Sequence, residues 1–416
     1  MTTKVISFLG YTPPDKRYQR TTYVFEGEPY PTPTPFMSEA AAHFFKPDEL
    51  LILVTAEAKG QNFGDLVKNL EGVITPTPVD IPSGKHEHEL WQIFAAMSER
   101  IQPGDRIIFD ITNGFRSLPV LAFLAASFVQ IVRQAQVERM VYGAFDAQDK
   151  GKGLTPVFDL TPFVRLLEWT TATNTFLKTG RFTDVGSLLK NPHEQHDTDL
   201  SKLADLMSTV SRGLHTSRPT HVMEQSHQLV QAIDQFSSDT QDQTQPFRLL
   251  LENIRTEYSQ FGLENLHDKK ELLKRLLKMI DWYVEKDLLI QAMTLAREWL
   301  VSLVVYYQGG DIFDDQRGNA KRGVPAGDRQ QAEAFITGHQ KDIQPSNELR
   351  TALPKIRDFW QQISDINQEQ SESRKDVGDI RNDLAHCGMR SNPRSPDEIA
   401  SAVRGICKDL QQLMPA

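Results

Sequence analysis

The chain has 416 residues, of which 39% are hydrophobic and 24% charged, and its net charge is −9 at pH 7. This length predicts two or three domains with sizeable cores, and the acidic balance excludes a broad basic face for nucleic acid. The two cysteines, Cys387 and Cys407, fit a reducing cytoplasm better than a disulfide framework, and no Cys/His cluster suggests a zinc site. We therefore expect a cytoplasmic protein without a metal, in which any activity on RNA rests on a local site.

The sequence also predicts that no membrane is involved. The N-terminus lacks the shape of a secretory signal, and the longest apolar stretch, Leu118 to Val132, has 15 residues. A helix that spans a bilayer needs about 20 apolar residues. We expect this stretch to form a buried helix.

Apolar runs alternate with helical patterns up to about residue 160. Such continuous runs are typical of parallel strands that are covered on both faces. Helical patterns lie between them, notably Glu87–Ile101 and Ser117–Gln134. The alternation predicts an α/β domain over residues 1–162, with an open, doubly wound sheet of Rossmann-like type. The predicted strands are Lys4–Leu9, Leu50–Val54, Arg106–Ile111 and Arg139–Ala144.

Two segments near the N-terminus fall outside this alternation. The proline-rich stretch Pro29–Pro35 cannot form a helix or a central strand, so we expect a surface loop. Thr21–Glu26 is expected to pair as a small hairpin near the end of the first strand.

From residue 163 onward the pattern is helical only. We expect an all-α part, with a helical connector over residues 163–262 and a second domain over 263–416. The most apolar helix is predicted at Leu288–Tyr307. The last helix has a clear start, with Ser395 as N-cap, Pro396 as first helical residue and Glu398 as the capping-box partner.

Polar segments follow two of the predicted strands, at the edge where open α/β sheets bind ligands. They are Gly10–Thr12 and Asn113–Ser117. Gly114 permits a close backbone approach, and amide groups at the start of the next helix suit a phosphate. A tight turn with Ser117 as N-cap would explain the second segment equally well. Asp110 is expected to be a structural hydrogen-bond acceptor.

The segment RNDLAH, Arg381 to His386, carries residues that can cleave RNA without a metal. On a helix Asn382 and His386 share a face, so the amide can orient the imidazole while Arg381 leans towards the edge of the same cleft. RNA supplies its own nucleophile, the 2′-OH; the histidine can take its proton, and the arginine can stabilise the crowded phosphate. Alternatively, the segment is only a helix end that Gly388 caps.

Several N-terminal segments resemble the CARF domain of CRISPR-associated accessory ribonucleases. The resemblance rests on Phe8–Tyr11, Tyr23–Phe25, Leu51–Thr55 and above all Asp110–Pro119. It implies a dimer that binds a cyclic oligoadenylate across its two-fold axis, with tetra-adenylate as first choice and hexa-adenylate as second. The ligand-binding positions that it implies are Gly10, Tyr11, Thr12, Asn113, Gly114, Phe115 and Arg116.

RNDLAH matches the signature of HEPN ribonucleases: an arginine, a polar residue, three further residues and a histidine. This resemblance implies an α-helical domain that dimerises through the helices bearing the motif, with Arg381, Asn382 and His386 as catalytic residues. Glu298 could contribute near the cleft, or could form a surface or packing pair with its neighbour Arg297.

The basic residues between the predicted helices also leave two interpretations open. Lys321, Arg322 and Arg329 could bring RNA to the groove, or could belong to a solvated loop.

The leading hypothesis is a cyclic-oligoadenylate-activated, metal-independent endoribonuclease of type III CRISPR antiviral defence that requires no cofactor. It would cleave single-stranded RNA to 2′,3′-cyclic phosphate and 5′-hydroxyl ends. We expect a homodimer, with Leu288–Tyr307 and RNDLAH near the two-fold axis. One alternative is a non-catalytic nucleotide-sensing regulator. Another is a sensor that also degrades its own ligand, with Thr12 or Asn113 positioning a 2′-OH.

Overall fold

The computed structural model of the chain divides into two compact units, Met1–Thr170 and Thr171–Ala416. The predicted domain boundaries after residues 162 and 262 stay predictions. The residues that the structure describes are 1–12, 18–114, 118–189, 198–236, 245–318, 325–338, 345–363, 384, 387, 389 and 394–415.

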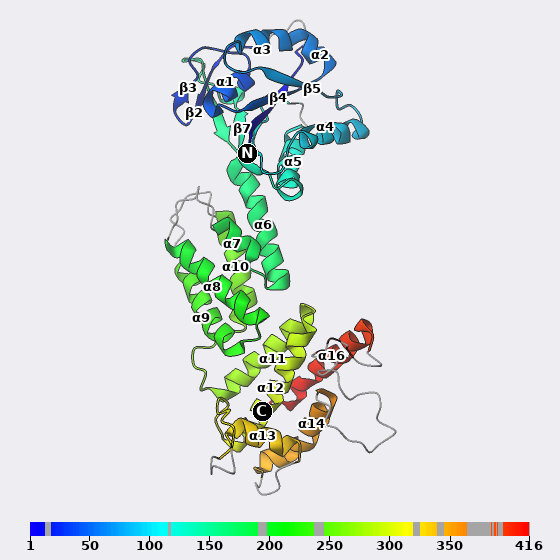
Figure 1. Ribbon diagram of the computed structural model, residues 1–416. Helices are drawn as coiled ribbons and strands as arrows, with labels where there is room; N and C mark the ends of the chain where they lie inside the picture. The colour runs from blue at the N-terminus through cyan, green and yellow to red at the C-terminus, as the bar shows by residue number, and fades with distance from the viewer. Residues whose placement is uncertain are drawn as a thin grey trace. The chain divides into compact units, whose positions relative to one another are not determined.

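The N-terminal unit is built on one sheet, whose described strands lie in the order β3-β2-β8-β7-β6-β1-β4-β5 (Figure 1). From β5 to β7 all neighbouring strands are parallel. β8 runs antiparallel to β7, β2 parallel to β8, and β3 antiparallel to β2. The strands are β1 (Thr3–Leu9), β2 (Thr22–Phe25), β3 (Glu28–Pro29), β4 (Glu49–Val54), β5 (Pro76–Asp80), β6 (Arg106–Asp110), β7 (Gln136–Gly143) and β8 (Leu154–Asp159).

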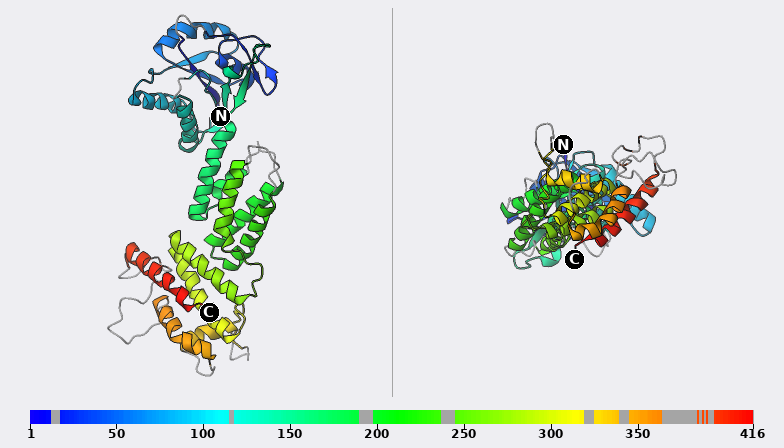
Figure 2. Two further views of the ribbon diagram at one scale, coloured as in Figure 1. Left: turned by 180° about the vertical axis from the view of Figure 1, so that it is seen from behind. Right: turned by 90° about the horizontal axis from the view of Figure 1, so that it is seen from below.

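Helices cover both faces of this sheet. One apolar core lies between the sheet and α1 and α3, and a second lies between the sheet and α4 and α5. Figure 2 shows the two groups of helices apart from each other in the view from behind. The predicted doubly wound fold is therefore confirmed. Its helices are α1 (Met37–Phe45), α2 (Ala56–Ala58), the π-helix η1 (Lys59–Phe63), α3 (Gly64–Asn69), α4 (Glu87–Glu99), α5 (Leu118–Val132), the short 3₁₀ helix η2 (Phe145–Ala147) and α6 (Thr161–Thr179).

All four predicted strands are present, but the sheet is larger than predicted. β5 and β8 were not predicted, because each contains proline and is only partly buried. The predicted hairpin is formed by β2 and β3, yet it pairs with β8, and three strands separate it from β1. The stretch Pro29–Pro35 lies at this edge of the sheet, where proline is tolerated.

The described residues of the C-terminal unit form helices and no strand, which confirms the all-α prediction. The last helix begins as predicted, with both hydrogen bonds of the Ser395–Glu398 capping box present. The helices are α7 (Thr183–Leu189), α8 (Thr198–His215), α9 (Pro219–Gln235), α10 (Gln245–Ser259), α11 (Lys269–Glu285), α12 (Leu289–Gln308), α13 (Asp328–Ile336), α14 (Asn347–Ile363), α16 (Pro396–Leu410) and the short 3₁₀ helix η4 (Gln411–Leu413).

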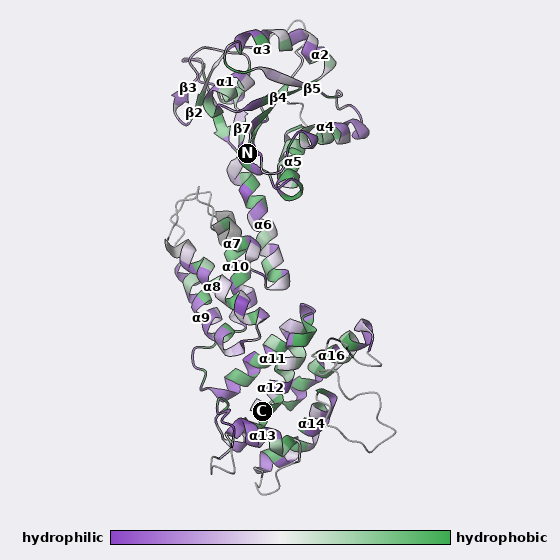
Figure 3. Cartoon of the chain, in the orientation of Figure 1, coloured by the Kyte–Doolittle hydropathy of each residue, from purple (hydrophilic) through white to green (hydrophobic). Residues whose placement is uncertain are grey.

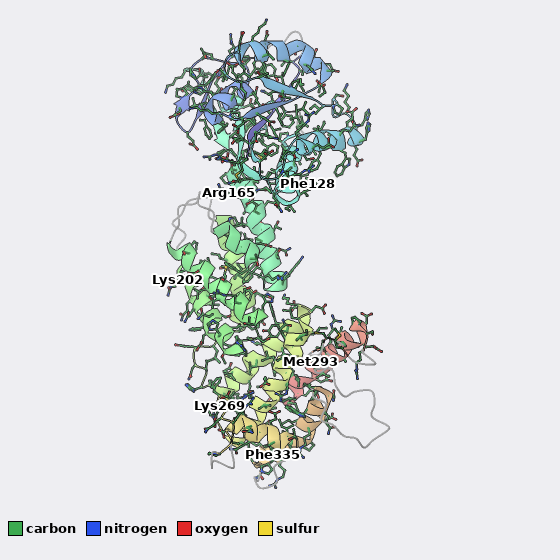
Figure 4. The ribbon with its side chains drawn as sticks, in the orientation of Figure 1. Phe128, Arg165, Lys202, Lys269, Met293 and Phe335 are labelled. Atoms are coloured by element: carbon green, nitrogen blue, oxygen red, sulfur yellow. The ribbon has the colours of Figure 1, made fainter. Side chains whose placement is uncertain are left out.

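The apolar helix α12 forms the core of this unit and packs against α11, α13, α14 and α16. Figure 4 labels two of the buried side chains there, Met293 on α12 and Phe335 on α13. By length and composition α12 is, among the described helices, long and apolar enough to cross a membrane, but 61% of the relevant window is buried inside the fold. A core helix passes the same test.

The burial of α12 concerns the expectation that this helix lies near the two-fold axis of a homodimer. Of the large hydrophobic side chains on α12, Ile290 is the exposed one, at 53%. The large apolar side chains of α12 are thus mostly covered by its own unit, and the expected place of this helix near a two-fold axis stays a prediction.

The first prediction concerns the core around α12. Trp299 is fully buried, and its indole Nε1 donates to the carbonyl of Leu273 at 3.0 Å. We expect Trp299→Ala to lower the free energy of unfolding by about 3–5 kcal/mol, because it leaves a cavity and removes the indole hydrogen bond. The control Ile290→Ala, at an exposed position, should change the free energy of unfolding by less than about 0.5 kcal/mol. Urea denaturation followed by helical circular dichroism measures both, and equal losses would contradict this assignment of the core.

Candidate functional site

The candidate site lies where the strand order of the sheet reverses. From β1 the chain builds outward through β4 and β5, then returns to the other side of β1 with β6 and continues to β7. The carboxyl ends of β1 and β6 therefore meet at the topological switch point, where open α/β sheets bind ligands. The two segments singled out in the sequence, after Leu9 and after Asp110, are the loops at this point.

A pocket of about 190 Å³ opens between these two loops. Gly10 and Tyr11 line it from the first loop, and Asn113 and Gly114 from the second. Tyr11 is exposed at its rim. The structure thus brings four of the predicted ligand-binding residues together. The rest of the lining is mostly apolar and consists of Phe8, Leu9, Tyr18, Leu53, Thr55, Ile81 and Leu118.

Gly10 is the point of closest approach between the two loops. A Cβ atom at this position would lie 2.7 Å from the Tyr18 hydroxyl and 3.0 Å from the carbonyl oxygen of Asn113. The Gly10 N–H donates to the Tyr18 hydroxyl at 3.0 Å, and burial raises the pKa of Tyr18 to about 12. The hydroxyl stays protonated at neutral pH, so it retains a proton to donate at the pocket.

Asn113 has an unused hydrogen-bond donor. Its side-chain Nδ2 is buried, and no acceptor among the described residues lies within hydrogen-bond distance of it. A buried donor without a partner costs about 1–3 kcal/mol and needs an explanation in a native fold. A ligand in the pocket that offers an acceptor would supply one.

Asp110 ends β6, and its hydrogen bonds fix the start of the second pocket loop. It is fully buried, and its two carboxyl oxygens accept from the Ser7 hydroxyl at 2.5 Å and from the Thr112 N–H at 3.0 Å. The Thr112 hydroxyl in turn accepts from the Gly143 N–H at 2.8 Å, which ties the loop to β7. The expected role of Asp110 as a structural acceptor agrees with these contacts.

Thr12 lies beside the pocket and is held by Gln61. The Thr12 N–H and hydroxyl both donate to Gln61 Oε1, at 3.0 and 3.3 Å, and Gln61 Nε2 donates to the Thr12 carbonyl at 2.7 Å. The next residue, Asn62, donates to the Gly10 carbonyl at 3.0 Å. These two amides on the π-helix η1 therefore fix the conformation of the first loop.

Gln61 and Asn62 were not predicted. They follow β4, the parallel neighbour of β1, so the rule that ligands bind beyond the carboxyl ends of strands could have indicated them. The π-helical turn that aims them at Gly10 and Thr12 could not be read from the sequence, although such turns are frequent at functional sites.

Other predicted site residues lie outside the described residues: Phe115, Arg116, Arg381, Asn382 and His386. Within the RNDLAH segment Leu384 is described, and so is Cys387, which directly follows the segment. Leu384 is helical, and Cys387 adopts a left-handed conformation with φ of 55°, its N–H donating to the Leu384 carbonyl at 3.2 Å.

Glu298 and Arg329 are paired with each other in the C-terminal unit. Arg329 Nη2 lies 2.5 Å from Glu298 Oε2, and Arg329 also donates to Ser302 Oγ and to the Ile312 carbonyl, each at 3.0 Å. Arg297 pairs with Glu298 as well, at 2.6 Å. These contacts favour the interpretation of Arg297–Glu298 as a packing pair and leave Arg329 largely engaged within the fold.

Within the described ranges, no three His, Cys, Asp or Glu side chains lie together as metal ligands would. The basic residues Lys321 and Arg322 fall outside those ranges.

Comparison with known proteins identifies the fold that carries this pocket. The family described as CRISPR system endoribonuclease Csx1, CARF domain, matches residues 4–146. The chain carries a CARF domain of the CRISPR-associated type. A second family, described as CRISPR-associated protein MJ1674, second domain, matches residues 165–270 of the helical part. The predicted resemblance to CRISPR-associated CARF proteins is confirmed.

Two individual proteins are similar to the chain over different lengths. CRISPR-associated protein MJ1674 of Methanocaldococcus jannaschii is 27% identical over 127 residues, which are 30% of this chain and only 20% of that relative. The solved structure of Enterococcus italicus Csm6 bound to cyclic hexa-2′-fluoro-hexa-dAMP is 10% identical, with a TM-score of 0.46 over 99% of this chain and 97% of that one.

The second prediction follows from the burial of Asp110, which raises its pKa above the usual value. A carboxyl group whose pKa is higher in the folded state stabilises the fold at low pH, and this contribution is lost as pH rises from about 4 through the folded pKa. The stability of the wild type relative to Asp110→Asn should therefore fall between pH 4 and neutral pH. Denaturation of both proteins over a pH series tests this, and parallel stability curves would contradict it.

Proposed function

We propose that the chain is a type III CRISPR effector that binds a cyclic oligoadenylate in its CARF domain and then cleaves single-stranded RNA with its C-terminal domain. The observation that carries the sensing half is the pocket at the switch point, in which Gly10 and Asn113 face each other and an amide donor is unpaired. The match of residues 4–146 to the CARF domain of a CRISPR system endoribonuclease supports both parts of the proposal. These parts are the binding of a cyclic oligoadenylate and the cleavage of RNA.

The size and chemistry of the pocket suit one segment of a larger ligand. Its volume of about 190 Å³ is below the roughly 300–1,000 Å³ of sites that enclose a drug-sized molecule. The Asn113 amide can donate to a ring nitrogen, a ribose hydroxyl or a phosphate oxygen, while apolar residues such as Leu53 and Ile81 can contact a base. Two such pockets in a homodimer would hold two halves of one ring, with tetra-adenylate as the first candidate.

The nuclease half rests on Arg381, Asn382 and His386. In the proposed reaction His386 takes the proton of the ribose 2′-OH, the oxygen attacks the adjacent phosphorus, and the bond to the 5′-oxygen breaks. The leaving 5′-oxygen takes up a proton from solvent, to which the imidazolium releases the proton it accepted, so that a 5′-hydroxyl end and a neutral histidine result. Arg381 stabilises the negative charge on the phosphate, and Asn382, four residues before His386 in the sequence, orients the imidazole. Atoms balance without a metal or a cofactor, because the nucleophile and the leaving group both belong to the RNA. We place this activity in the cytoplasm, where the substrate RNA is found.

The third prediction tests the catalytic residues. We expect Arg381→Ala or His386→Ala to lower the rate of activator-dependent RNA cleavage at least about 10²-fold, because each removes a group that acts in the transition state. Binding of the activator should be unchanged, since the pocket lies in another unit. The control is His221→Ala, an exposed histidine on α9. The assay measures cleavage of labelled single-stranded RNA in EDTA, with and without each cyclic oligoadenylate.

The outcomes of this assay separate the candidate functions. Near-normal turnover of His386→Ala would mean that the catalytic site lies elsewhere. Tight activator binding without RNA cleavage in the wild type would favour the non-catalytic regulator. Decay of the activator during the assay, retained in His386→Ala, would add degradation of the ligand by the sensor.

The fourth prediction tests the sensor. Asn113→Ala should raise the activator concentration that gives half-maximal cleavage about 10-fold, because a hydrogen bond of about 1 kcal/mol and the ligand contacts it aligns are lost. Gln61→Ala should raise this activator concentration less, because Gln61 only fixes the position of Thr12. The maximal rate should stay nearly constant in both. The control is the exposed Asn265→Ala in the helical unit, and unchanged activation curves for both pocket variants would rule out this sensor assignment.

A further inference from the structure

The polypeptide passes from the first compact unit to the second once, within helix α6. The boundary lies between Thr170 and Thr171, and α6 continues to Thr179. Gly180 then closes the helix with a left-handed φ of 68°, and its N–H donates to the carbonyl of Phe176 at 2.7 Å. Any change that the chain itself carries from the CARF domain into the helical unit therefore arrives at this turn.

A cluster of buried rings packs the end of α6 against α10 and α11. Phe176 is stacked on Tyr258 of α10, with ring centroids 4.9 Å apart, and Trp282 of α11 lies against Phe261 at 5.9 Å. Tyr258 and Phe261 are themselves 6.1 Å apart, so the four rings form one continuous cluster. At most 2% of each of these residues is exposed. In a close-packed interior a ring cannot shift unless its neighbours shift as well.

Gly180 also brings the turn after α6 into direct contact with Trp282. A Cβ atom at this position would lie 2.6 Å from the indole Cη2 atom, so only a glycine leaves room for the ring. Two hydrogen bonds hold the same part of α11 to other helices. Trp282 Nε1 donates to Glu257 of α10 at 2.8 Å, and the Tyr283 hydroxyl donates to the carbonyl of Leu214 in α8 at 2.8 Å. α11 is therefore tied to α8, to α10 and to the turn after α6.

The same end of α11 is joined to α16, the last α-helix of the chain. Gln411, directly after α16, donates to Asp281 at 2.7 Å, and Arg404 of α16 donates to Asp287 at 2.9 Å. α11 also packs against α16. Hydrophobic and hydrophilic residues are mixed along α11, which fits a helix with contacts on several sides (Figure 3). We call the segment Asp281–Asp287 the α11 end.

We propose that the α11 end couples the position of α6 to that of α16. A shift of the turn at Gly180 displaces the Trp282 ring and with it the α11 end, whose polar contacts carry the displacement to α16. Packed side chains and whole helices are the elements through which distant sites are coupled. Because α16 follows the RNDLAH segment in the chain, its displacement acts on the part that bears the proposed catalytic residues. Regulation of RNA cleavage through this link rests on the proposed function, whereas the link itself does not.

Two matched glycine substitutions test the link without any ligand. In Gly180→Ala the added Cβ meets the Trp282 ring at 2.6 Å, and in Gly213→Ala it meets Val222 of α9 at 2.7 Å. Both changes overpack the helical unit, but the first presses on α11 and the second on α9. Hydrogen exchange of the full-length protein, followed by mass spectrometry, should be at least about threefold faster in α16 for Gly180→Ala. Gly213→Ala should leave exchange in α16 as it is in the wild type.

The same variant tests whether the link regulates RNA cleavage. The quantity measured is the ratio of the cleavage rate with saturating cyclic oligoadenylate to the rate without it. Gly180→Ala should lower this ratio at least about 10-fold, which lies within the range of 5- to 150-fold that is typical of coupled sites. Activator binding in calorimetry should be retained, because the pocket is not altered. Circular dichroism checks the fold, and if Gly180→Ala does not fold, Trp282→Phe, which loses the same contact, should give both effects.

The contact between the α11 end and α16 is tested at an exposed ion pair, where substitution costs little stability. Arg404→Gln and Asp287→Asn each remove this pair, whose side chains are 54% and 69% exposed. Asparagine also tolerates the left-handed conformation of Asp287. Each variant should lower the cleavage ratio about threefold, and the double variant no further, because both changes remove one contact. The control is Arg255→Gln, which breaks a similar exposed pair with Asp234 of α9 and should leave the ratio unchanged.

The outcomes distinguish this inference from the proposed function. Exchange in α16 that Gly180→Ala and Gly213→Ala affect equally would overturn the link, even if RNA cleavage is activated as proposed. Wild-type cleavage ratios in both Gly180→Ala and Arg404→Gln would overturn the regulatory role of the α11 end. Faster exchange in α16 of Gly180→Ala, in a protein whose wild type neither binds cyclic oligoadenylate nor cleaves RNA, would support the link and refute the proposed function alone.

Discussion

The neighbouring strands β1 and β6 are joined by a buried hydrogen bond from the Ser7 hydroxyl to the Asp110 carboxyl group, 2.5 Å long. Asp110 ends β6, and its other oxygen holds the Thr112 N–H, so the same side chain fixes the strand and the first turn of the loop beyond it. Because Gly10 has no side chain, the loop after β1 can come against this turn. The pocket, its unpaired Asn113 amide and the start of α5 all depend on this arrangement.

The sequence predicted those parts of the fold in which burial is complete. β1, β4 and β6 are nearly continuous buried runs because the sheet is covered on both faces, whereas β7 was predicted from its more apolar second half. β5 and β8 are short, contain proline and alternate between buried and exposed positions, so their composition resembles that of loops. Their place in the sheet is decided by pairing with distant strands, which a local pattern does not encode.

The candidate site was predicted to a similar extent. The glycine and asparagine loops were found because the carboxyl ends of parallel strands meet at one edge, and the structure places four of the predicted residues at one pocket. Gln61 and Asn62 were missed because their role depends on a π-helical turn. The apolar composition of a segment also did not show whether its helix is buried on all sides. Leu288–Tyr307 and Leu118–Val132 are both strongly apolar. In the structure α12 is buried within its unit, whereas one side of α5 is exposed to solvent.

The direction of β8 has a mechanical consequence. Because β8 runs antiparallel to β7, the chain turns back at the carboxyl edge, and α6 starts beside Met140, in the middle of β7. Farther along α6, Glu168 contacts Gln130 near the end of α5, so α6 leaves the domain at the edge opposite the pocket. The pocket is thus separated from the point where α6 leaves the domain by the length of the strands.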